Sequence, residues 1–219
     1  MTVIAVVDYD VGNLHSACKG LERVGGRPFL ATTAADLTRA DGIVLPGVGA
    51  FDAAMAELQG RGLVEPLQQA ARSGKPFLGI CLGLQLLFEG SDEGQLPGLG
   101  LVSGRVEAIP PAPGLTIPHM GWNALHLTQP GLPLWQHLPD PAWVYFVHSF
   151  HGVPEDPAWV VATVNHGHQT LTAAIAQDNL MAVQFHPEKS GETGLAILHN
   201  FVEAVRAGRP LVAPCPPTP

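Results

Sequence analysis

Charge and cysteine are both scarce in this sequence of 219 residues. Charged residues make up 14% of the chain, and 11 basic residues against 19 acidic ones give a formal net charge of −8. No lysine or arginine cluster is present to neutralise phosphates, which argues against a nucleic-acid surface. The three cysteines, Cys18, Cys81 and Cys215, are too sparse for a disulfide framework or a cysteine-based zinc site. The first apolar run has no basic leader and is too short to span a bilayer, so we expect a globular cytoplasmic protein.

The first part of the chain alternates short apolar runs with helical patterns. β-Branched and apolar residues at 3–7 and 42–46 are typical of strands that are buried on both faces of a parallel sheet. This rhythm predicts an α/β fold with a mostly parallel central sheet and flanking helices. Another short strand is expected near Phe29, and the expected helices lie at 13–24, 51–58 and 63–71.

After residue 95, proline and glycine become dense and the strand candidates become short. These candidates are predicted to form a smaller antiparallel region packed at one side of the parallel core. A last apolar strand at 181–185 and an amphipathic helix at 193–206 close a single domain, residues 1–207. Residues 208–219 are predicted to be a proline-rich tail. The antiparallel candidates are 105–109, 123–127, 144–147, 160–164 and 173–176.

Cys81 stands where an apolar run meets good helix formers. Gly79 and Gly83 flank it, and the pattern predicts a buried strand, a sharp turn at Cys81 and a helix from Leu82 to Phe88. A nucleophile at such a turn sits in a strained backbone, and neighbours without a Cβ allow close approach. A helix N-terminus also favours a thiolate. The alternative is that Cys81 is a small buried hydrophobe, the usual fate of a free cysteine.

The last apolar strand ends in the sequence H-P-E, which places His186 two residues before Glu188. The carboxyl ends of parallel strands meet at one edge of the sheet, so His186 and Cys81 are expected to be neighbours. A histidine there can take a proton from the thiol, and Glu188 can hold the imidazole in one tautomer. Although a buried core histidine is the alternative, the combined pattern favours a Cys81–His186–Glu188 catalytic triad.

The motifs G-I-C-L-G-L-Q at 79–85 and H-P-E at 186–188 resemble those of class I, triad-type glutamine amidotransferases. Three further stretches are similar to those of the glutaminase subunits of imidazole glycerol phosphate synthase. They are D-Y-D-V-G-N-L at 8–14, P-G-V-G-A-F at 46–51 and P-H-M-G-W-N at 118–123. The H-P-E motif also continues as K-S, as in that family. The resemblance covers nearly the whole chain up to about residue 206.

The resemblance implies an enzyme that hydrolyses glutamine to glutamate and ammonia. It also implies a heterodimer with a (β/α)8-barrel cyclase subunit, which uses the ammonia to make imidazole glycerol phosphate in histidine biosynthesis. No cofactor and no metal are expected. One rival is the glutaminase subunit of anthranilate or aminodeoxychorismate synthase, which would not be expected to carry the first and third of these stretches. Another is a non-catalytic regulatory subunit, against which the complete triad argues.

Hydrogen-bond donors for an oxyanion are expected at two places. The backbone N–H of Leu82 follows the nucleophile, and the glycine-flanked segment with Val48 and Gly49 can turn an N–H inward. Without the family resemblance, a plain turn would explain that segment. The resemblance further implies a glutamine pocket formed by Gln85, His148, Ser149 and Phe150.

The resemblance also implies an interface for the cyclase, with Trp122 as its anchor and Asn13 and Lys189 on the same face. Two departures from the family pattern are visible. Asp10 stands where glycine is usual, and aspartate tolerates a positive φ better than most residues. Phe150 stands where a tyrosine is common. A pair of histidines at 166 and 168 lacks a nearby carboxylate and is predicted to lie in a loop, not to hold a metal.

Overall fold

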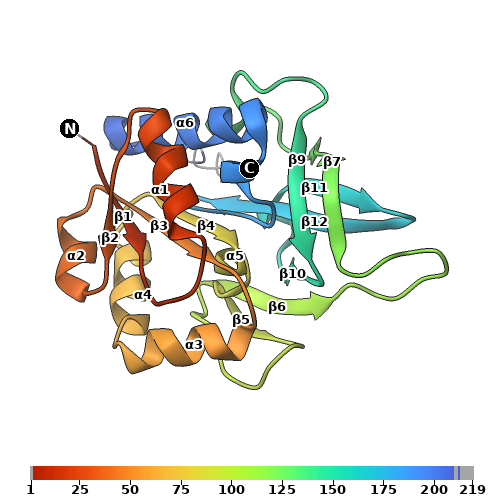
Figure 1. Ribbon diagram of the computed structural model, residues 1–219, viewed down its shortest axis with the longest axis horizontal. Helices are drawn as coiled ribbons and strands as arrows, with labels where there is room; N and C mark the ends of the chain where they lie inside the picture. The colour runs from red at the N-terminus through yellow and green to blue at the C-terminus, as the bar shows by residue number, and fades with distance from the viewer. Residues whose placement is uncertain (1, 210–211, 213–219) are drawn as a thin grey trace, which may run out of the picture.

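An eight-stranded sheet forms the centre of the computed structural model, which describes residues 2–209 and 212 (Figure 1). Its first five strands are parallel, and the last three continue the same sheet with antiparallel pairing. The predicted mostly parallel α/β fold is therefore confirmed. The strands, in spatial order, are β2 (Arg27–Ala31), β1 (Val3–Val7), β3 (Gly42–Gly47), β4 (Phe77–Cys81), β13 (Leu180–Val183), β12 (Gln169–Gln177), β11 (Val160–His166) and β8 (His126–Leu127).

Helices cover both faces of the parallel part of the sheet (Figure 1). Alternate residues of β1 point to opposite faces, as the two-residue period of a strand requires. Ile4 and Val6 belong to one apolar core, whereas Ala5 and Val7 belong to the other. The first core is closed by α1 (Leu14–Arg23) and α6 (Gly191–Ala207), and the second by α2 (Ala34–Arg39), α3 (Phe51–Gly60) and α4 (Val64–Arg72).

Two small sheets lie beside the central one. The first contains β10 (Phe150–Pro154), β6 (Val102–Ala108) and β5 (Phe88–Ser91), and the second pairs β7 (His119–Ala124) with β9 (Trp143–His148). Strand β10, which pairs with β6, was not among the predicted strands. The prediction of a separate antiparallel region holds for β6, β7 and β9. It does not hold for β11 and β12, which extend the main sheet. Short 3₁₀ turns are η1 (Pro133–Trp135), η2 (Pro157–Trp159) and η3 (Pro187–Lys189).

The helix after Cys81 is shorter than predicted. It is a single turn, α5 (Leu82–Gln85), and Phe88 already belongs to strand β5. The reason is tertiary, because the carbonyls of Leu86 and Leu87 accept hydrogen bonds from the backbone at 99, 101 and 102 instead of continuing a helix. Residues 82–88 are all buried and, apart from Gln85, apolar, so their pattern does not distinguish a helix from a strand.

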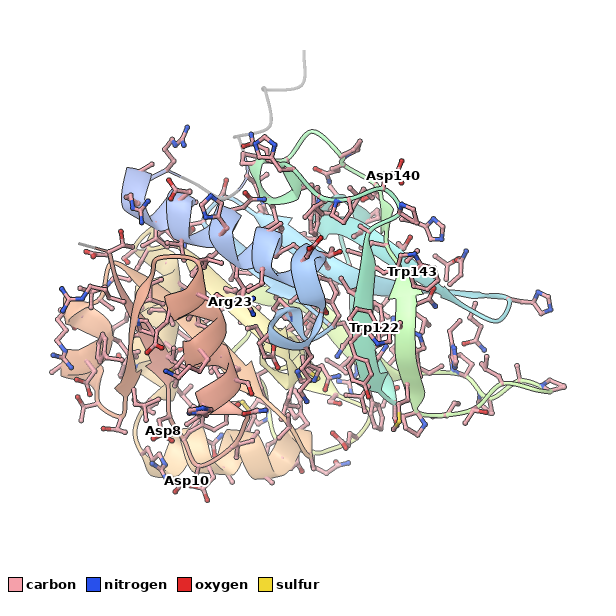
Figure 2. All side chains as sticks on the ribbon, turned by 45° about the horizontal axis from the view of Figure 1, so that its top comes forward. Asp8, Asp10, Arg23, Trp122, Asp140 and Trp143 are labelled. Atoms are coloured by element: carbon pink, nitrogen blue, oxygen red, sulfur yellow. The ribbon has the colours of Figure 1, made fainter. Side chains whose placement is uncertain are left out.

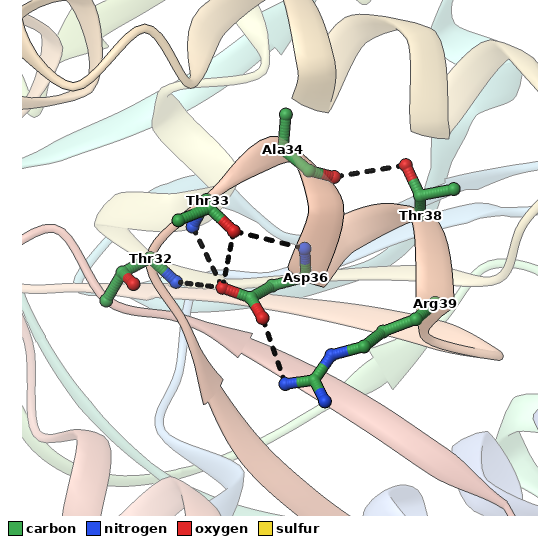
Figure 3. Close-up of polar contacts among 6 residues, drawn as sticks. All are labelled: Thr32, Thr33, Ala34, Asp36, Thr38 and Arg39. Carbon is green, nitrogen blue, oxygen red and sulfur yellow. Dashed lines mark hydrogen bonds and ion pairs between the residues drawn. The ribbon is translucent and has the colours of Figure 1, made fainter.

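Helix α2 was not predicted, although its first residues carry a capping signal. The Thr33 hydroxyl accepts a hydrogen bond from the Asp36 backbone N–H, and the Asp36 carboxylate accepts one from the Thr33 N–H (Figure 3). Arg39 then donates to the other oxygen of the same carboxylate, 2.9 Å away (Figure 3). A threonine followed three residues later by an acidic residue could therefore have located this helix.

The closing helix agrees with its prediction to within two residues at either end. It ends at Ala207, and the capping residue Gly208 adopts a left-handed conformation with φ of 58°. Apart from Gly208, Arg209 and Val212, the predicted proline-rich tail lies outside the described residues.

Candidate active site

Cys81 sits at the sharp turn between β4 and α5. Its φ of 55° and ψ of −110° are unfavourable for a residue with a side chain, as predicted for an elbow. The glycines on both sides are required by close packing. A Cβ at Gly83 would lie 1.8 Å from the Leu45 carbonyl oxygen, and one at Gly79 would lie 2.8 Å from the Gly83 carbonyl oxygen. The local sequence therefore allows α5 to fold directly against β3 and to hold the thiol at the sheet edge.

His186 and Glu188 form a buried pair just after β13. The imidazole Nδ1 donates to Glu188 Oε1 at 2.8 Å, and the two side chains are only 2% and 3% exposed. Burial alone would lower the pKa of His186, but its interactions with Cys81 and Glu188 outweigh burial and raise that pKa to about 9. The other ring nitrogen, Nε2, makes no hydrogen bond within the described part of the chain. It is therefore available for proton transfer.

A cavity of about 300 Å³ brings most of the predicted site residues together. This volume lies at the lower end of the range of about 300–1,000 Å³ that is usual for small-molecule sites. Cys81 and His186 line it, and Glu188 stands behind His186. The other predicted residues that line it are Leu82, Val48, Gly49, Gln85, His148, Ser149 and Phe150.

The segment with Val48 and Gly49 leaves the end of β3 directly beside the nucleophile. Gly47 is paired with Cys81 in the sheet, and Gly49 has a φ of 98° with no atom within 4 Å of its missing Cβ. The preceding carbonyl, that of Pro46, accepts a hydrogen bond of 2.8 Å from the buried Tyr9 hydroxyl. The segment is thus anchored at Pro46 and open at Gly49, so a change of the Gly49 backbone would meet little steric resistance.

The pocket wall opposite this segment is built around the Phe150 carbonyl. It accepts hydrogen bonds from Gln85 Nε2 at 3.2 Å and from His148 Nδ1 at 2.8 Å. The second ring nitrogen of His148 is 2.9 Å from His119 Nδ1, so both nitrogens of His148 are engaged within the protein. Burial, despite the bond to Phe150, lowers the pKa of His148 to about 3. His148 is therefore neutral and supports the wall.

Two polar residues of this site were missed by the sequence reasoning. Glu93 comes from the loop after β5 and is the only carboxylate among the residues that line the cavity; one of its oxygens accepts the Phe51 backbone N–H at 2.9 Å. Such a group can pair with an ammonium ion. Gln184 is fully buried, with its Nε2 3.8 Å from the Cys81 sulfur. The one sequence signal that could have identified Gln184 as a site residue is its position two residues before His186.

An apolar face lies on the outside of the β7–β9 pair. Met120 and Trp122 of β7 are exposed there, and the β9 residue Trp143 lies on the same side because it is paired with Ala124 (Figure 2). Trp122 is 54% exposed, so it is not an ordinary core tryptophan.

The other two residues of the predicted interface are also exposed. Lys189 lies in η3, and its neighbour Gly191 would place a Cβ 3.9 Å from the Trp122 ring. Asn13 caps α1, which packs against η3. The structure thus brings Gly191, two residues after Lys189, close to Trp122, and it places Asn13 at the start of the helix that packs against η3.

The departures from the family pattern are accommodated locally. Asp10 has a φ of 61°, so its position does require the conformation that glycine supplies, and its carboxylate pairs with Arg61. His166 ends β11 and its Nε2 contacts the Thr116 carbonyl at 2.8 Å, while His168 lies in the following turn. Within residues 2–209 and 212, no group of three or more histidine, cysteine or acidic side chains gathers as a metal site. Nor does any helix in these residues have the length and apolarity needed to cross a membrane.

Comparison with known proteins agrees with this fold. The family "Glutamine amidotransferase class-I" matches residues 6–205. Two solved structures, titled "Crystal structure of glutamine amidotransferase" and "Structure of PurLQS from Thermotoga maritima", share the fold with TM-scores of 0.71 and 0.69. Each covers 92% of this chain and 98% of the solved chain, at 19% and 21% sequence identity. The chain belongs to the class-I glutamine amidotransferase family.

Curated relatives of the chain indicate which group within this family it is most similar to. A protein of Synechococcus sp. (strain JA-3-3Ab) is 63% identical, over 92% of this chain and 94% of the relative. A protein of Cyanothece sp. (strain PCC 7425) is 62% identical, over 94% of this chain and 98% of the relative. Both carry the name "Imidazole glycerol phosphate synthase subunit HisH". Within the class, the chain belongs with these HisH subunits.

Proposed function

We propose that this chain hydrolyses glutamine to glutamate and ammonia through a Cys81–His186–Glu188 triad. It passes the ammonia to a (β/α)8-barrel cyclase subunit that makes imidazole glycerol phosphate in histidine biosynthesis. The observation that carries this proposal is the single cavity that holds Cys81 on its strained turn and His186 with its buried carboxylate partner. The names of the relatives support the choice of partner.

The first half of the reaction is formation of a thioester. The Cys81 thiolate attacks the side-chain carboxamide carbon of glutamine, and the carbonyl oxygen becomes an oxyanion. Because the raised pKa of His186 keeps its proton at neutral pH, the imidazolium can give that proton to the departing ammonia. The C–N bond breaks and the γ-glutamyl thioester remains.

The second half is hydrolysis of the thioester. His186, now neutral, removes a proton from water as the oxygen attacks the same carbon, and glutamate leaves with the thiolate restored. Glu188 holds the ring so that Nε2 serves both steps. The backbone N–H groups of Leu82 and of the segment with Val48 and Gly49 stabilise the oxyanion, and each such donor is typically worth about 3 kcal/mol of barrier.

We expect the isolated chain to be a weak glutaminase. The open turn at Gly49 lets the second oxyanion donor take its active position only in the complex, so the cyclase with its nucleotide substrate should stimulate glutamate release by about 100-fold or more, the value of one donor. Glutamate release is measured for the chain alone, with the cyclase, and with the cyclase and nucleotide. Full activity of the chain alone would contradict the stimulation, and no activity in any sample would contradict the proposed function.

The apolar face on β7 and β9 is the proposed interface with the cyclase, and Trp122 is its anchor. Replacing Trp122 with alanine should weaken the complex by about 30-fold, the effect of losing an interface residue worth about 2 kcal/mol. The matched control is Leu30→Ala, because Leu30 is 49% exposed on β2, an edge strand of the central sheet, whereas β7 and β9 form a separate sheet. Isothermal titration of each variant with the cyclase gives the Kd, and equal values for Trp122→Ala and wild type would exclude Trp122 as the anchor.

A further inference from the structure

Gln184 is a fully buried polar side chain that points at the reactive sulfur. It follows β13, and its backbone N–H is fixed by the Ala173 carbonyl at 2.8 Å. Its side-chain Nε2 lies 3.8 Å from Cys81 Sγ, and its Oε1 lies 3.2 Å from Gln85 Nε2. The mechanism described above assigns it no role. Burying a side-chain amide costs free energy unless both its N–H groups and its oxygen find hydrogen-bond partners.

The chemistry of the neighbouring groups determines which end of the Gln184 amide faces the sulfur. The Phe150 carbonyl can only accept, and it receives the Gln85 Nε2 N–H at 3.2 Å. The same Gln85 nitrogen therefore donates its other N–H to the Gln184 oxygen. The Gln184 nitrogen is left to face the sulfur, so a fixed acceptor two hydrogen bonds away orients an N–H donor toward Cys81.

A thiolate at this position needs such a donor. Cys81 is buried, and a buried anion without hydrogen bonds is strongly disfavoured. Among the titratable groups that interact electrostatically with the sulfur are His186 and Tyr9. The Tyr9 hydroxyl is committed to the Pro46 carbonyl, and burial together with the charge at Cys81 raises the pKa of Tyr9, so it stays neutral. His186 loses its proton to ammonia during the reaction, whereas an amide N–H of Gln184 is never lost.

We propose that Gln184 is a further catalytic residue, which donates a hydrogen bond to the Cys81 thiolate and keeps it ionised and correctly placed for attack. Gln85 is a positioning residue, because it orients Gln184 by donating to its oxygen. This inference rests on the proposed function only in taking Cys81 as the nucleophile. The donor serves the thiolate at the start of the reaction and again when the thioester is released.

The test is alkylation of Cys81 by iodoacetamide as a function of pH, because only the thiolate reacts. Gln184→Met removes the amide at similar volume, and Gln184→Glu replaces the N–H donor with a carboxylate oxygen. Since Cys18 and Cys215 also react, the Cys81 peptide is followed by mass spectrometry. We expect the rate at pH 7 to fall about tenfold in Gln184→Met, with the midpoint of the pH–rate curve about one unit higher, and further in Gln184→Glu.

Two controls separate this role from a structural one. Gln68→Met removes an amide that donates to the Leu99 carbonyl away from the site, and its alkylation curve should match wild type. Gln85→Met, which leaves Gln184 in place without its orienting partner, should shift the curve in the same direction by a smaller amount. If the Gln184 variants do not fold, as judged by thermal unfolding, Gln85→Met decides. The proposal is overturned if folded Gln184→Met shows the same pH dependence of Cys81 alkylation as wild type. If the Gln184 variants do not fold, the same result for Gln85→Met overturns it.

The same measurements distinguish this inference from the proposed function. Alkylation needs neither glutamine nor the cyclase. If the alkylation curve of Gln184→Met is shifted but the wild-type complex releases no glutamate, the role of Gln184 as thiolate donor is supported and the proposed glutaminase function is contradicted. If the wild-type complex releases glutamate but the alkylation curve of Gln184→Met is not shifted, the glutaminase function is supported and the role of Gln184 is contradicted.

Discussion

Replacing Cys81 with alanine is expected to abolish glutamine-dependent synthesis by the complex and to leave ammonia-dependent synthesis intact. This is the largest effect on activity that we expect, at least about 10⁴-fold in glutamate release, because no other group can form the thioester. The cyclase subunit is unchanged and can use ammonia from solution. Two assays measure the result, glutamate release from glutamine and imidazole glycerol phosphate formation with an ammonium salt.

The control for this variant is a second thiol in the same chain. Cys18 lies half-buried on α1, so Cys18→Ala removes a cysteine without touching the cavity. It should keep the wild-type rate in both assays. Glutamate release by Cys81→Ala at the wild-type rate would show that the nucleophile has been wrongly assigned. Loss of ammonia-dependent synthesis in the same variant would show that the substitution damages the complex itself.

The largest effect on stability is expected at Gly83. An alanine there places a methyl group 1.8 Å from the Leu45 carbonyl oxygen, which belongs to the backbone of a central strand and cannot move aside. Either α5 separates from β3 or the strand shifts, and we expect a loss of about 3 kcal/mol or more in the free energy of unfolding, at the upper end for overpacking. Urea unfolding followed by circular dichroism gives this quantity.

Gly60→Ala is the matched substitution. Gly60 ends α3, has no atom within 4 Å of its missing Cβ and does not require a positive φ. Alanine there should leave stability within about 1 kcal/mol of wild type and can raise it, because alanine favours the helix. An unfolding midpoint of Gly83→Ala equal to that of Gly60→Ala would mean that the turn at Cys81 can relax without cost.

The parallel part of the fold was predictable because its signals are local. Strand β3 is a continuous apolar run, and α1 shows helical spacing within a few residues. The turn at Cys81 was also predictable, since glycines on both sides of a cysteine indicate that backbone segments pack closely there. The end of α5 was not, because the hydrogen bonds that stop the helix come from the backbone at 99–102.

The same distinction applies to the site. The proximity of Cys81 and His186 was predictable because the carboxyl ends of parallel strands meet at one edge of the sheet, and Glu188 follows His186 by two residues. Gln184 was overlooked because its importance depends on Gln85 and on the Phe150 carbonyl, which are distant in sequence. Glu93 was overlooked because it stands in a loop without periodicity. His148 lines the cavity as predicted, and both of its ring nitrogens are engaged within the protein, which the sequence did not indicate.

The alternation of side chains in the β7–β9 pair constrains how the sequence of β7 can evolve. Because side chains alternate along a strand, Met120 and Trp122 face outward while His119 and His148 face inward toward the pocket wall. Even-numbered positions of β7 are therefore free to vary with whatever surface covers them, and odd-numbered positions are constrained by the chemistry beneath. A one-residue insertion or deletion in β7 would exchange the two sets and damage both at once. Substitutions should therefore accumulate at the even-numbered positions of β7, whereas insertions and deletions in this strand should be eliminated.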